Sequence, residues 1–298
     1  MIDLTSVDDG KFLEEIERRF LEKNASITEM QGMTRHLLEM NEKARQAEAI
    51  KNEFLSLIKN EFNNPISSLL SFSKALAHGK HTHRAGEMTR MAHQEMLRLD
   101  FHMQNIFAAA EIESGQLQND YTEVQLEEVM EQVCRYLRYI IDEKSLDINV
   151  KNNLSRPFIS DNQKFFTMLL NLVSNACEYS HDQSCIEITA TESPDGMIIL
   201  QVTDQGEGIP TQYHDRIYNR FTQFHSGKNR PHTGLGLGLS VVKGVAESLE
   251  GSISSQSEPG KTTFTLLFPA KPSDLEHGSD NMKEFDDEPF DDEDTLEL

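Results

Sequence analysis

The fold of this chain is decided by residues 204–240, which read DQGEGIPTQYHDRIYNRFTQFHSGKNRPHTGLGLGLS. A strand-like run ends at Asp204, and Gly206 and Gly208 follow it before a proline. At the other end, Gly234, Gly236 and Gly238 lead without a break into an amphipathic helix. Glycine-rich turns at the start of a helix expose backbone N–H groups at the positive end of its dipole, where phosphates bind. The stretch therefore predicts a nucleotide site.

An asparagine pair precedes this stretch. The segment NQKFFTMLLNLVSNACEYS predicts a helix with Asn171 and Asn175 four residues apart on one face. An asparagine oxygen beside a phosphate-binding loop suits Mg²⁺, which prefers a few oxygen ligands together with phosphates and water. The order Asn171 to Asn175, Asp204 to Gly208, Phe221 to Phe224 and Gly234 to Gly238 resembles the N, G1, F and G2 boxes of the histidine-kinase ATPase domain. The resemblance covers roughly residues 50 to 270 and extends to the superfamily that includes gyrase and the Hsp90 chaperones.

The resemblance implies roles for individual residues. Asp204 matches the aspartate that accepts a hydrogen bond from the adenine amino group, and Gly206 and Gly208 let the backbone approach the base. Asn175 matches the Mg²⁺ ligand, and Asn171 matches a neighbouring nucleotide-contacting position. ATP and Mg²⁺ are therefore the expected ligands.

The loop from Phe221 to Thr233 resembles the mobile ATP lid of the family. Lys228 and Arg230 are candidate phosphate contacts within it, and a solvated surface role for both is the alternative. The glycines expected to wrap the phosphates are Gly234, Gly236 and Gly238. The sequence departs from the family at Glu178, where a lysine is usual, because a carboxylate repels a triphosphate unless it turns away.

The charge of the chain is strongly acidic and uneven. The 298 residues carry a formal net charge of −22, and the last 25 positions hold twelve acidic residues and one lysine. We expect residues 273–298 to be a disordered tail, because they have too little apolar surface to fold. The lack of a basic stripe argues against nucleic-acid binding.

The sequence also indicates a compartment. Its longest apolar runs are far shorter than a membrane span, and no signal peptide opens it. The cysteines Cys134, Cys177 and Cys185 are scattered, fit a reducing compartment and show no metal-ligand spacing. We therefore expect a cytoplasmic protein in which Cys177 is a small core residue.

The N-terminal segment carries a coiled-coil stripe. Apolar or small residues recur with a 3,4 rhythm between Leu13 and Ala44, which predicts a parallel coiled-coil signalling helix over residues 1–50. The stripe continues through Ala47 and Ile50, and these two successive steps of three mark a stammer that overwinds the coil. The stammer is either a signalling hinge or a join between two packing registers.

Residues 51–118 predict a helical hairpin for dimerisation. Its first helix should continue through Pro65 with a bend and end near the polar turn at residues 79–86. Its second helix carries an apolar face from Met88 onward and should stop at Gly115. A hairpin cannot bury this stripe alone, so two copies should form a four-helix bundle and the chain a homodimer.

The remaining residues, 119–272, alternate strand and helix patterns. A YTEV strand, a helix from about Leu126 to Asp142 and strands around Ile148 and Phe158 should precede the Asn175 helix. Two antiparallel hairpins should turn at residues 194–196 and 259–260. The predicted fold class is α+β: a coiled coil and helical hairpin, then an α/β sandwich of the histidine-kinase, gyrase and Hsp90 type with a mixed sheet covered on one face by helices.

FLSLIKNEFNNPI, residues 54–66, is similar to the phosphoacceptor segment of histidine kinases but departs from it at the acceptor. The family pattern is a histidine, a glutamate, two variable residues, then a threonine or asparagine before proline. Glu61, Asn64 and Pro65 match this pattern, and Asn60 stands at the histidine position. Phosphoryl transfer needs an imidazole nitrogen with a free lone pair, whereas a carboxamide nitrogen offers only donors. We therefore expect no autophosphorylation at Asn60.

Three explanations of Asn60 are open. The chain is a natural degenerate kinase, or it is an engineered inactive version of a functional one, or another histidine is the acceptor. His93 and His102 on the second helix are the nearest candidates by element, but neither is followed by a glutamate and a proline in the required pattern.

The resemblance implies a two-component signal-transduction histidine kinase that takes part in a phosphorelay. Such a protein binds Mg-ATP and exchanges phosphoryl groups with the receiver domain of a response regulator docked on the hairpin. One alternative is a phosphatase of that regulator, because Asn64 matches the residue that orients the attacking water in family members with phosphatase activity. Another is a non-catalytic ATP-binding scaffold that acts with a partner kinase. A clamp-type ATPase is disfavoured because no transducer domain follows residue 270. The input signal is expected to arrive through the coil, a partner or the tail, because no sensor domain precedes the coil.

Overall fold

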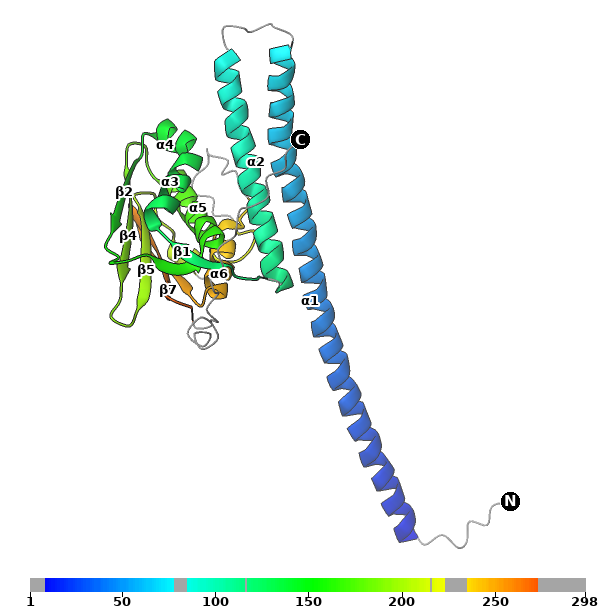
Figure 1. Ribbon diagram of the computed structural model, residues 1–298. Coiled ribbons are helices and arrows are strands. Elements are labelled where there is room, and N and C mark those ends of the chain that lie inside the picture. The colour runs from blue at the N-terminus through cyan, green and yellow to red at the C-terminus, as the bar shows by residue number, and fades with distance from the viewer. Residues whose placement is uncertain (1–8, 78–84, 116, 215, 223–234, 273–298) are drawn as a thin grey trace, which may run out of the picture. The chain divides into compact units, whose positions relative to one another are not determined.

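A computed structural model of the chain describes residues 9–77, 85–115, 117–214, 216–222 and 235–272 (Figure 1). The chain divides into two compact units, Met1–Asn60 and Glu61–Leu298. The predicted turn at residues 79–86 lies largely outside the described residues, and the predicted acidic tail lies outside them entirely.

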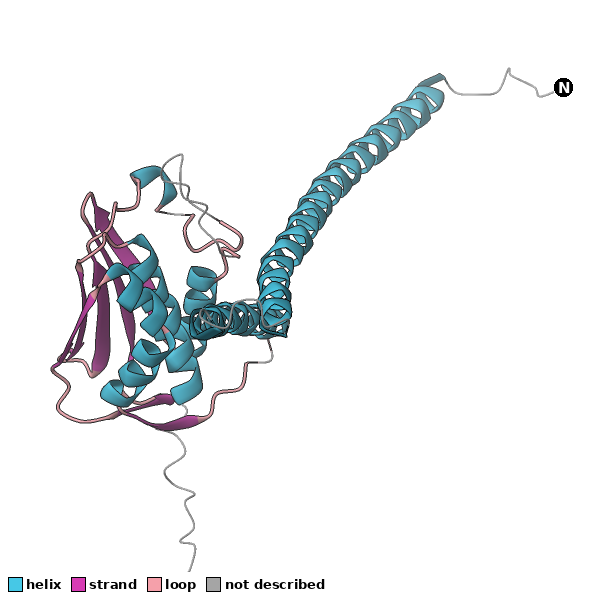
Figure 2. Ribbon diagram, turned by 90° about the horizontal axis from the view of Figure 1, so that it is seen from above, coloured by secondary structure: helices cyan, strands magenta, loops and turns pink. Residues whose placement is uncertain are grey.

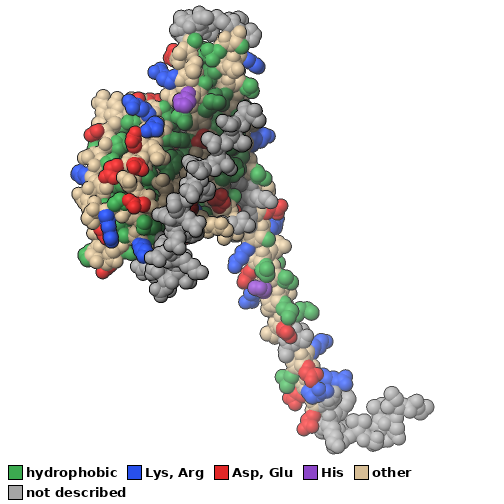
Figure 3. Space-filling model, viewed as in Figure 1, with side chains coloured by type: hydrophobic (Ala, Val, Ile, Leu, Met, Phe, Trp, Pro, Cys, Tyr) green, Lys and Arg blue, Asp and Glu red, His purple; other side chains and the backbone are tan. Residues whose placement is uncertain are grey.

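The described residues of the first unit belong to one helix. Helix α1 spans Asp9–Ala77 and continues through Pro65, as the sequence predicts. In the first unit, Phe20, Met30 and Leu37 of the predicted stripe are each more than half exposed. Hydrophobic side chains are visible at intervals along this helix in Figure 3. A long helix with an exposed apolar stripe is what a coiled coil requires, because isolated helices gain most of their stability by packing such a face.

The hairpin of the second unit consists of the end of α1 and helix α2, Ala85–Ser114. Helix α2 stops before Gly115, as predicted, and Gly115 has a φ of 66°, the left-handed conformation that glycine adopts at helix ends. An apolar groove runs between the two helices, and its lining includes Ile66, Leu70 and Met96, all of which are exposed. The hairpin therefore leaves an apolar face uncovered within this chain.

An α/β layer follows the hairpin. Its elements are β1 (Tyr121–Val124), α3 (Leu126–Tyr136), α4 (Arg138–Lys144), β2 (Asp147–Asn152), β3 (Phe158–Asp161), α5 (Asn162–Tyr179), β4 (Cys185–Glu192), β5 (Met197–Asp204), the 3-10 helix η3 (Thr211–Tyr213), α6 (Gly238–Ser248), β6 (Ser252–Glu258) and β7 (Lys261–Pro269). The strand before the glycine-rich stretch ends at Asp204, as predicted.

The main sheet is mixed and has the strand order β2-β4-β5-β7-β6. Strands β2 and β4 are parallel, whereas β4–β5, β5–β7 and β6–β7 are antiparallel, which confirms both predicted hairpins. Figure 2 shows the helices against one face of this sheet. Alternate residues of the strands, such as Ile188, Leu200 and Leu266, are buried on that face, where α5 also contributes Phe165 and Cys177 to the core.

Two details differ from the sequence prediction. The helix expected from Leu126 to Asp142 is two helices, because the buried Leu137 leaves the helical conformation with a φ of −92° and a ψ of 7°. Strands β1 and β3 do not join the main sheet but pair with each other. Phe158 of β3 is buried against Phe165 and Phe268, with ring centroids 5.0 and 5.4 Å away, and this aromatic packing fixes the small sheet beside α5.

Within the described residues, no helix has both the length and the hydropathy needed to cross a bilayer.

Candidate nucleotide-binding site

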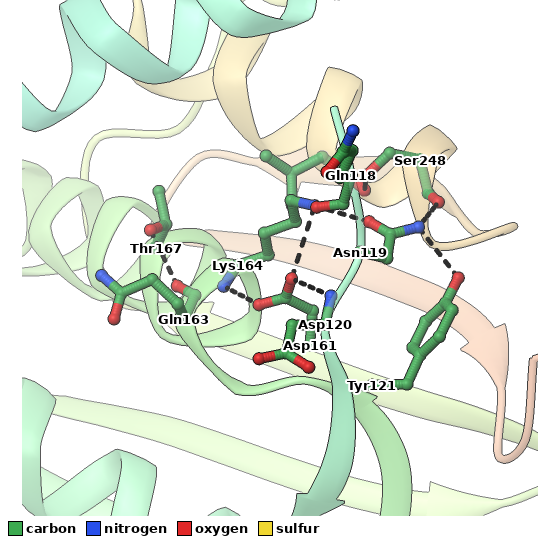
Figure 4. Close-up of polar contacts among 10 residues, drawn as sticks. Gln118, Asn119, Asp120, Tyr121, Asp161, Gln163, Lys164, Thr167 and Ser248 are labelled. Carbon is green, nitrogen blue, oxygen red and sulfur yellow. Dashed lines mark hydrogen bonds and ion pairs between the residues drawn. The ribbon is translucent and has the colours of Figure 1, made fainter. Parts of the chain in front are cut away.

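Helix α5 carries the asparagine pair, and polar contacts fix its N-terminal end (Figure 4). Asp161 caps the helix, because its Oδ1 accepts a hydrogen bond from the Lys164 backbone N–H at 3.0 Å. Its Oδ2 accepts from the Asp120 N–H at 3.0 Å and lies 3.4 Å from Lys164 Nζ. Lys164 Nζ also donates to Asn119 Oδ1 at 2.6 Å and to the Gln118 carbonyl. This nearly buried cluster ties the segment after α2 to the start of α5.

The C-terminal end of α5 is held by Lys144. Its ammonium donates to the carbonyl oxygens of Cys177 at 2.8 Å, of Ser180 at 3.1 Å and of Glu178. These carbonyls would otherwise be unpaired at the negative end of the helix dipole, so the cation stabilises them. With both ends fixed, α5 presents Asn171 and Asn175 in a defined orientation.

Asp204 lies at one end of the candidate site. It closes β5 with only 4 % of its surface exposed, and burial raises the pKa of its carboxyl to about 6. The Gly206 N–H donates to Asp204 Oδ1 at 3.0 Å and partly offsets that rise. A buried carboxylate is a strong acceptor, and a ligand amino group would satisfy it.

The two glycines after Asp204 are required by close backbone approaches. A Cβ on Gly206 would lie 2.4 Å from the Tyr179 carbonyl oxygen. Gly208 has a φ of 81°, and a Cβ there would lie 2.6 Å from the Glu258 carbonyl oxygen. The chain can therefore make this tight turn only without side chains at both positions.

The N-terminus of α6 lies at the other end of the site. Gly238 is its first residue, and a Cβ there would lie 2.6 Å from Asn171 Oδ1. Asn171 is 2 % exposed, and its Nδ2 donates to the Thr167 carbonyl at 2.9 Å, so its carboxamide is held against Gly238. Gly236 has a φ of 63°, and its carbonyl accepts from the Phe221 N–H at 2.8 Å. These contacts leave the first N–H groups of α6 at the edge of a cavity, where an anion can bind.

Two adjoining cavities connect these ends. A cavity of about 100 Å³ is lined by Asp204, Gly208 and Thr262, and a second of about 140 Å³ is lined by Asn171, Gly236 and Gly238. We call them the Asp204 cavity and the Gly238 cavity. The residues that line both are Asn175, Tyr179, Ile217, Thr222 and Leu239. Asn175, half-buried, thus lies between the carboxylate end and the helix end.

Other predicted site residues are not brought together in this way. Lys228, Arg230, Gly234 and nearly all of the predicted lid lie outside the described residues. Asn60 and Glu61 occupy helical positions in α1, and Asn64 is exposed on the same helix. Glu178 is half-buried and lines the Gly238 cavity.

The structure adds residues that the sequence prediction missed. Thr262 is buried and faces Asp204 as its partner in the β5–β7 register. Ser257 Oγ accepts from the Ile209 N–H at 2.7 Å and fixes the loop after Gly208. Helix α2 adds His102 to the Gly238 cavity, and burial, with a smaller effect of Arg98, lowers the pKa of this imidazole to about 4. Only strand register and helix packing reveal these residues, because none of them belongs to a local motif.

The residues of the site fit a nucleotide with magnesium. No group of three His, Cys, Asp or Glu side chains suited to a metal occurs among the residues described here. The Asn175 oxygen, together with the phosphates of a bound nucleotide, would suit a divalent cation, because Mg²⁺ favours such oxygen ligands.

Part of the α/β layer matches a known family. Residues 160–272 match the family model described as histidine kinase-, DNA gyrase B-, and HSP90-like ATPase. The chain is 27% identical over 256 residues to the sensor protein EvgS of Escherichia coli K12, covering 82% of this chain and 21% of EvgS. It is also 27% identical over 248 residues to the sensor-like histidine kinase SenX3 of Mycolicibacterium smegmatis, covering 81% of this chain and 63% of SenX3. The chain thus spans about a fifth of EvgS and under two thirds of SenX3.

Solved structures share the fold. The histidine kinase AdeS of Acinetobacter baumannii aligns with a TM-score of 0.52 at 22% identity, covering 70% of this chain and 97% of that one. Full-length ShkA in complex with AMPPNP aligns with a TM-score of 0.53 at 22% identity, covering 73% of this chain and 45% of that one. The helical region followed by an α/β layer is therefore an arrangement known in other proteins.

Proposed function

We propose that the chain binds Mg-ATP and exchanges phosphoryl groups with the receiver domain of a response regulator in the cytoplasm, and the match of residues 160–272 to the ATPase family supports this proposal. The observation that carries the proposal is the pair of adjoining cavities, with the buried Asp204 at one end and the N-terminus of α6 at the other. A purine nucleotide needs the same two features, a polar acceptor for its base and N–H donors for its phosphates.

Each end of the site has a distinct task in this proposal. Asp204 accepts a hydrogen bond from the adenine amino group, while Gly206 and Gly208 leave room for the base. The backbone N–H groups at Gly236 and Gly238 bind phosphate, and the Asn175 oxygen binds Mg²⁺. Bound Mg-ATP supplies the phosphoryl group and the cation that neutralises charge on the phosphates. Lys228 and Arg230 of the predicted lid, and Gly234 after it, would complete the phosphate contacts.

The hairpin provides the dimer and the docking surface for the regulator. Its groove exposes Ile66, Leu70 and Met96, and a second copy of the chain would cover this apolar face in a four-helix bundle. The stripe of α1 in the first unit would pair in parallel with that of the second copy over residues 1–50 and transmit the input signal.

Asn60 cannot carry the phosphoryl group, because a carboxamide cannot form a phosphoramidate. Exchange with the regulator therefore needs an imidazole, either restored at position 60 or supplied by another histidine. The second candidate function is dephosphorylation of the regulator. It is favoured by Asn64, whose exposed carboxamide on α1 is available to orient a water molecule.

The test supplies the missing imidazole. Asn60→His should give acid-labile, ATP-dependent phosphorylation of the purified chain, and the unmodified chain should give none. Adding Glu61→Ala to the histidine variant should slow the reaction about a hundredfold, because it removes the general base that orients the ring. Phosphorylation of the unmodified chain would show that another histidine is the acceptor, with His93 and His102 the first to be replaced.

The loss of phosphate from a phosphorylated regulator distinguishes a phosphatase from a non-catalytic scaffold. If the chain is a phosphatase, the unmodified protein should accelerate loss of phosphate from a phosphorylated receiver domain, and Asn64→Ala should remove that acceleration. A protein that binds Mg-ATP but shows neither reaction, even with Asn60→His, would be the non-catalytic scaffold.

A further inference from the structure

Helix α2 is packed closely against the α/β layer. The Tyr136 hydroxyl of α3 lies 2.6 Å from Asp100 Oδ2 and 3.0 Å from the Leu97 carbonyl oxygen. Farther along α2, a Cβ on Gly244 of α6 would lie 2.7 Å from the Ile112 side chain, so the two helices touch where Gly244 has no side chain. These contacts hold α2 in a fixed register on the domain.

The same helix forms one wall of the Gly238 cavity. Phe101, His102 and Asn105 line it together with Asn175 and Glu178 of α5. The hairpin therefore contributes side chains to the end of the site where α6 begins. None of these α2 residues belongs to the motifs that define the nucleotide site.

Asn105 is the distinctive member of this wall. It is 5 % exposed, and its Oδ1 has no hydrogen-bond partner among the described residues. A buried carboxamide oxygen without a partner is destabilising, and such a group in a folded protein usually has a ligand or water. Because this oxygen can only accept hydrogen bonds or bind a cation, phosphate oxygens cannot satisfy it.

The side chains that neighbour Asn105 in the cavity also favour a cation. Asn175 and Glu178 line the cavity with oxygen-bearing groups, and hard divalent cations take such oxygens as ligands. A carboxylate at position 178 would repel a bare triphosphate but attracts a metal ion bound to it.

We propose that Asn105 of α2 contacts the Mg²⁺ end of the bound nucleotide, either the ion itself or a water on it. The proposal rests on the nucleotide site proposed above. It makes the hairpin part of that site, so Mg-nucleotide binding and docking of α2 on the domain strengthen each other by the same factor. Loss of α2 contacts would then weaken Mg-ATP binding, and Mg-ATP would stabilise the docked hairpin.

The test is calorimetric titration of the full chain with ATP in Mg²⁺ and in EDTA. Asn105→Leu, which keeps the side-chain size, should weaken ATP binding about tenfold in Mg²⁺ and leave it unchanged in EDTA. Gln94→Leu is the matched control, since it removes an amide from the same helix outside the cavity, and it should bind as the unmodified chain does. Asn105→Asp keeps the acceptor oxygens and should bind Mg-ATP within a few-fold of the unmodified chain.

A second readout separates this role from a structural one. Without ligand, Asn105→Leu should melt at the same or a higher temperature than the unmodified chain, because it removes a buried unpaired oxygen. In Mg-ATP its rise in melting temperature should be smaller.

Unchanged Mg-ATP affinity in Asn105→Leu, or an equal loss with and without Mg²⁺, would overturn the inference and leave the nucleotide site standing. An Asn105→Asp protein as weak as the leucine variant would also overturn it. Failure of the unmodified chain to bind ATP would remove the proposed function and the inference together.

Discussion

Asp204→Asn tests whether the buried carboxylate at the end of β5 exists for a ligand. The variant keeps the shape and the oxygen that accepts from the Gly206 N–H, and it removes the charge. Burial holds the folded pKa at about 6, above the ordinary value of 3.8, so the folded chain binds this proton more tightly than the unfolded chain. The stability that protonation provides is therefore fully present below pH 3.8 and is lost as the pH rises through about 6.

The size of this loss of unfolding free energy follows from the pKa shift of Asp204. Two pKa units correspond to about 3 kcal/mol of unfolding free energy, and solvent entry would reduce that value. The Asp204→Asn variant has no carboxyl at this position to titrate, so its unfolding free energy lacks this pH-dependent loss. The unfolding free energy of Asp204→Asn minus that of the unmodified chain should therefore rise by up to about 3 kcal/mol between pH 4 and pH 7.5.

Urea unfolding of both proteins across that pH range measures the difference, because effects of other groups cancel. Adding Mg-ATP at a hundred times its dissociation constant should stabilise the unmodified chain by about 2.7 kcal/mol at pH 7.5. Mg-ATP should add little to the unfolding free energy of the Asp204→Asn variant. Its side-chain amino group would face the adenine amino group, and two donors cannot form a hydrogen bond. A difference that is flat with pH would refute the burial argument, and equal stabilisation by Mg-ATP would refute the assignment of Asp204 to the base.

Three further outcomes test the packing that shapes the site. Gly238→Ala should lower the unfolding free energy by about 1–3 kcal/mol, because the added Cβ clashes with Asn171. In an Asn171→Ala background the same change should be neutral or stabilising in urea unfolding. An equal loss of unfolding free energy in both backgrounds would contradict the contact. Lys164→Met should lower the unfolding free energy by about 3 kcal/mol or more, because it leaves the Asp161 carboxylate buried without its cation. Adding Asp161→Asn to this variant should recover much of that loss, as measured by thermal unfolding. Gly206→Ala should abolish Mg-ATP binding in calorimetry, because its Cβ would push apart the turn and the end of α5; wild-type affinity would show that the turn can move aside.

Local signals predicted most of the elements. Strands β4 and β5, helix α5 and the stop at Gly115 follow from side-chain periodicity and from turn residues, which act within a few positions of the chain. The break between α3 and α4 escaped prediction because neither glycine nor proline marks it, and Leu137 leaves the helix while buried in the core. The separate sheet of β1 and β3 also escaped, because the choice of strand partner is made by aromatic packing around Phe158.

The order of amino acids is enough to show which chemistry is available: a carboxylate after a strand, glycines before a helix, paired asparagines, and a carboxamide at position 60 where an imidazole is needed. Those properties belong to single side chains and short spacings, so no fold is required to state them. Only the tertiary structure placed Thr262 opposite Asp204, pressed Asn171 against Gly238 and brought Asn105 of α2 into the cavity at the start of α6. Strand register and helix docking decide these contacts, because they depend on the packing of segments far apart in the chain, which no local pattern records.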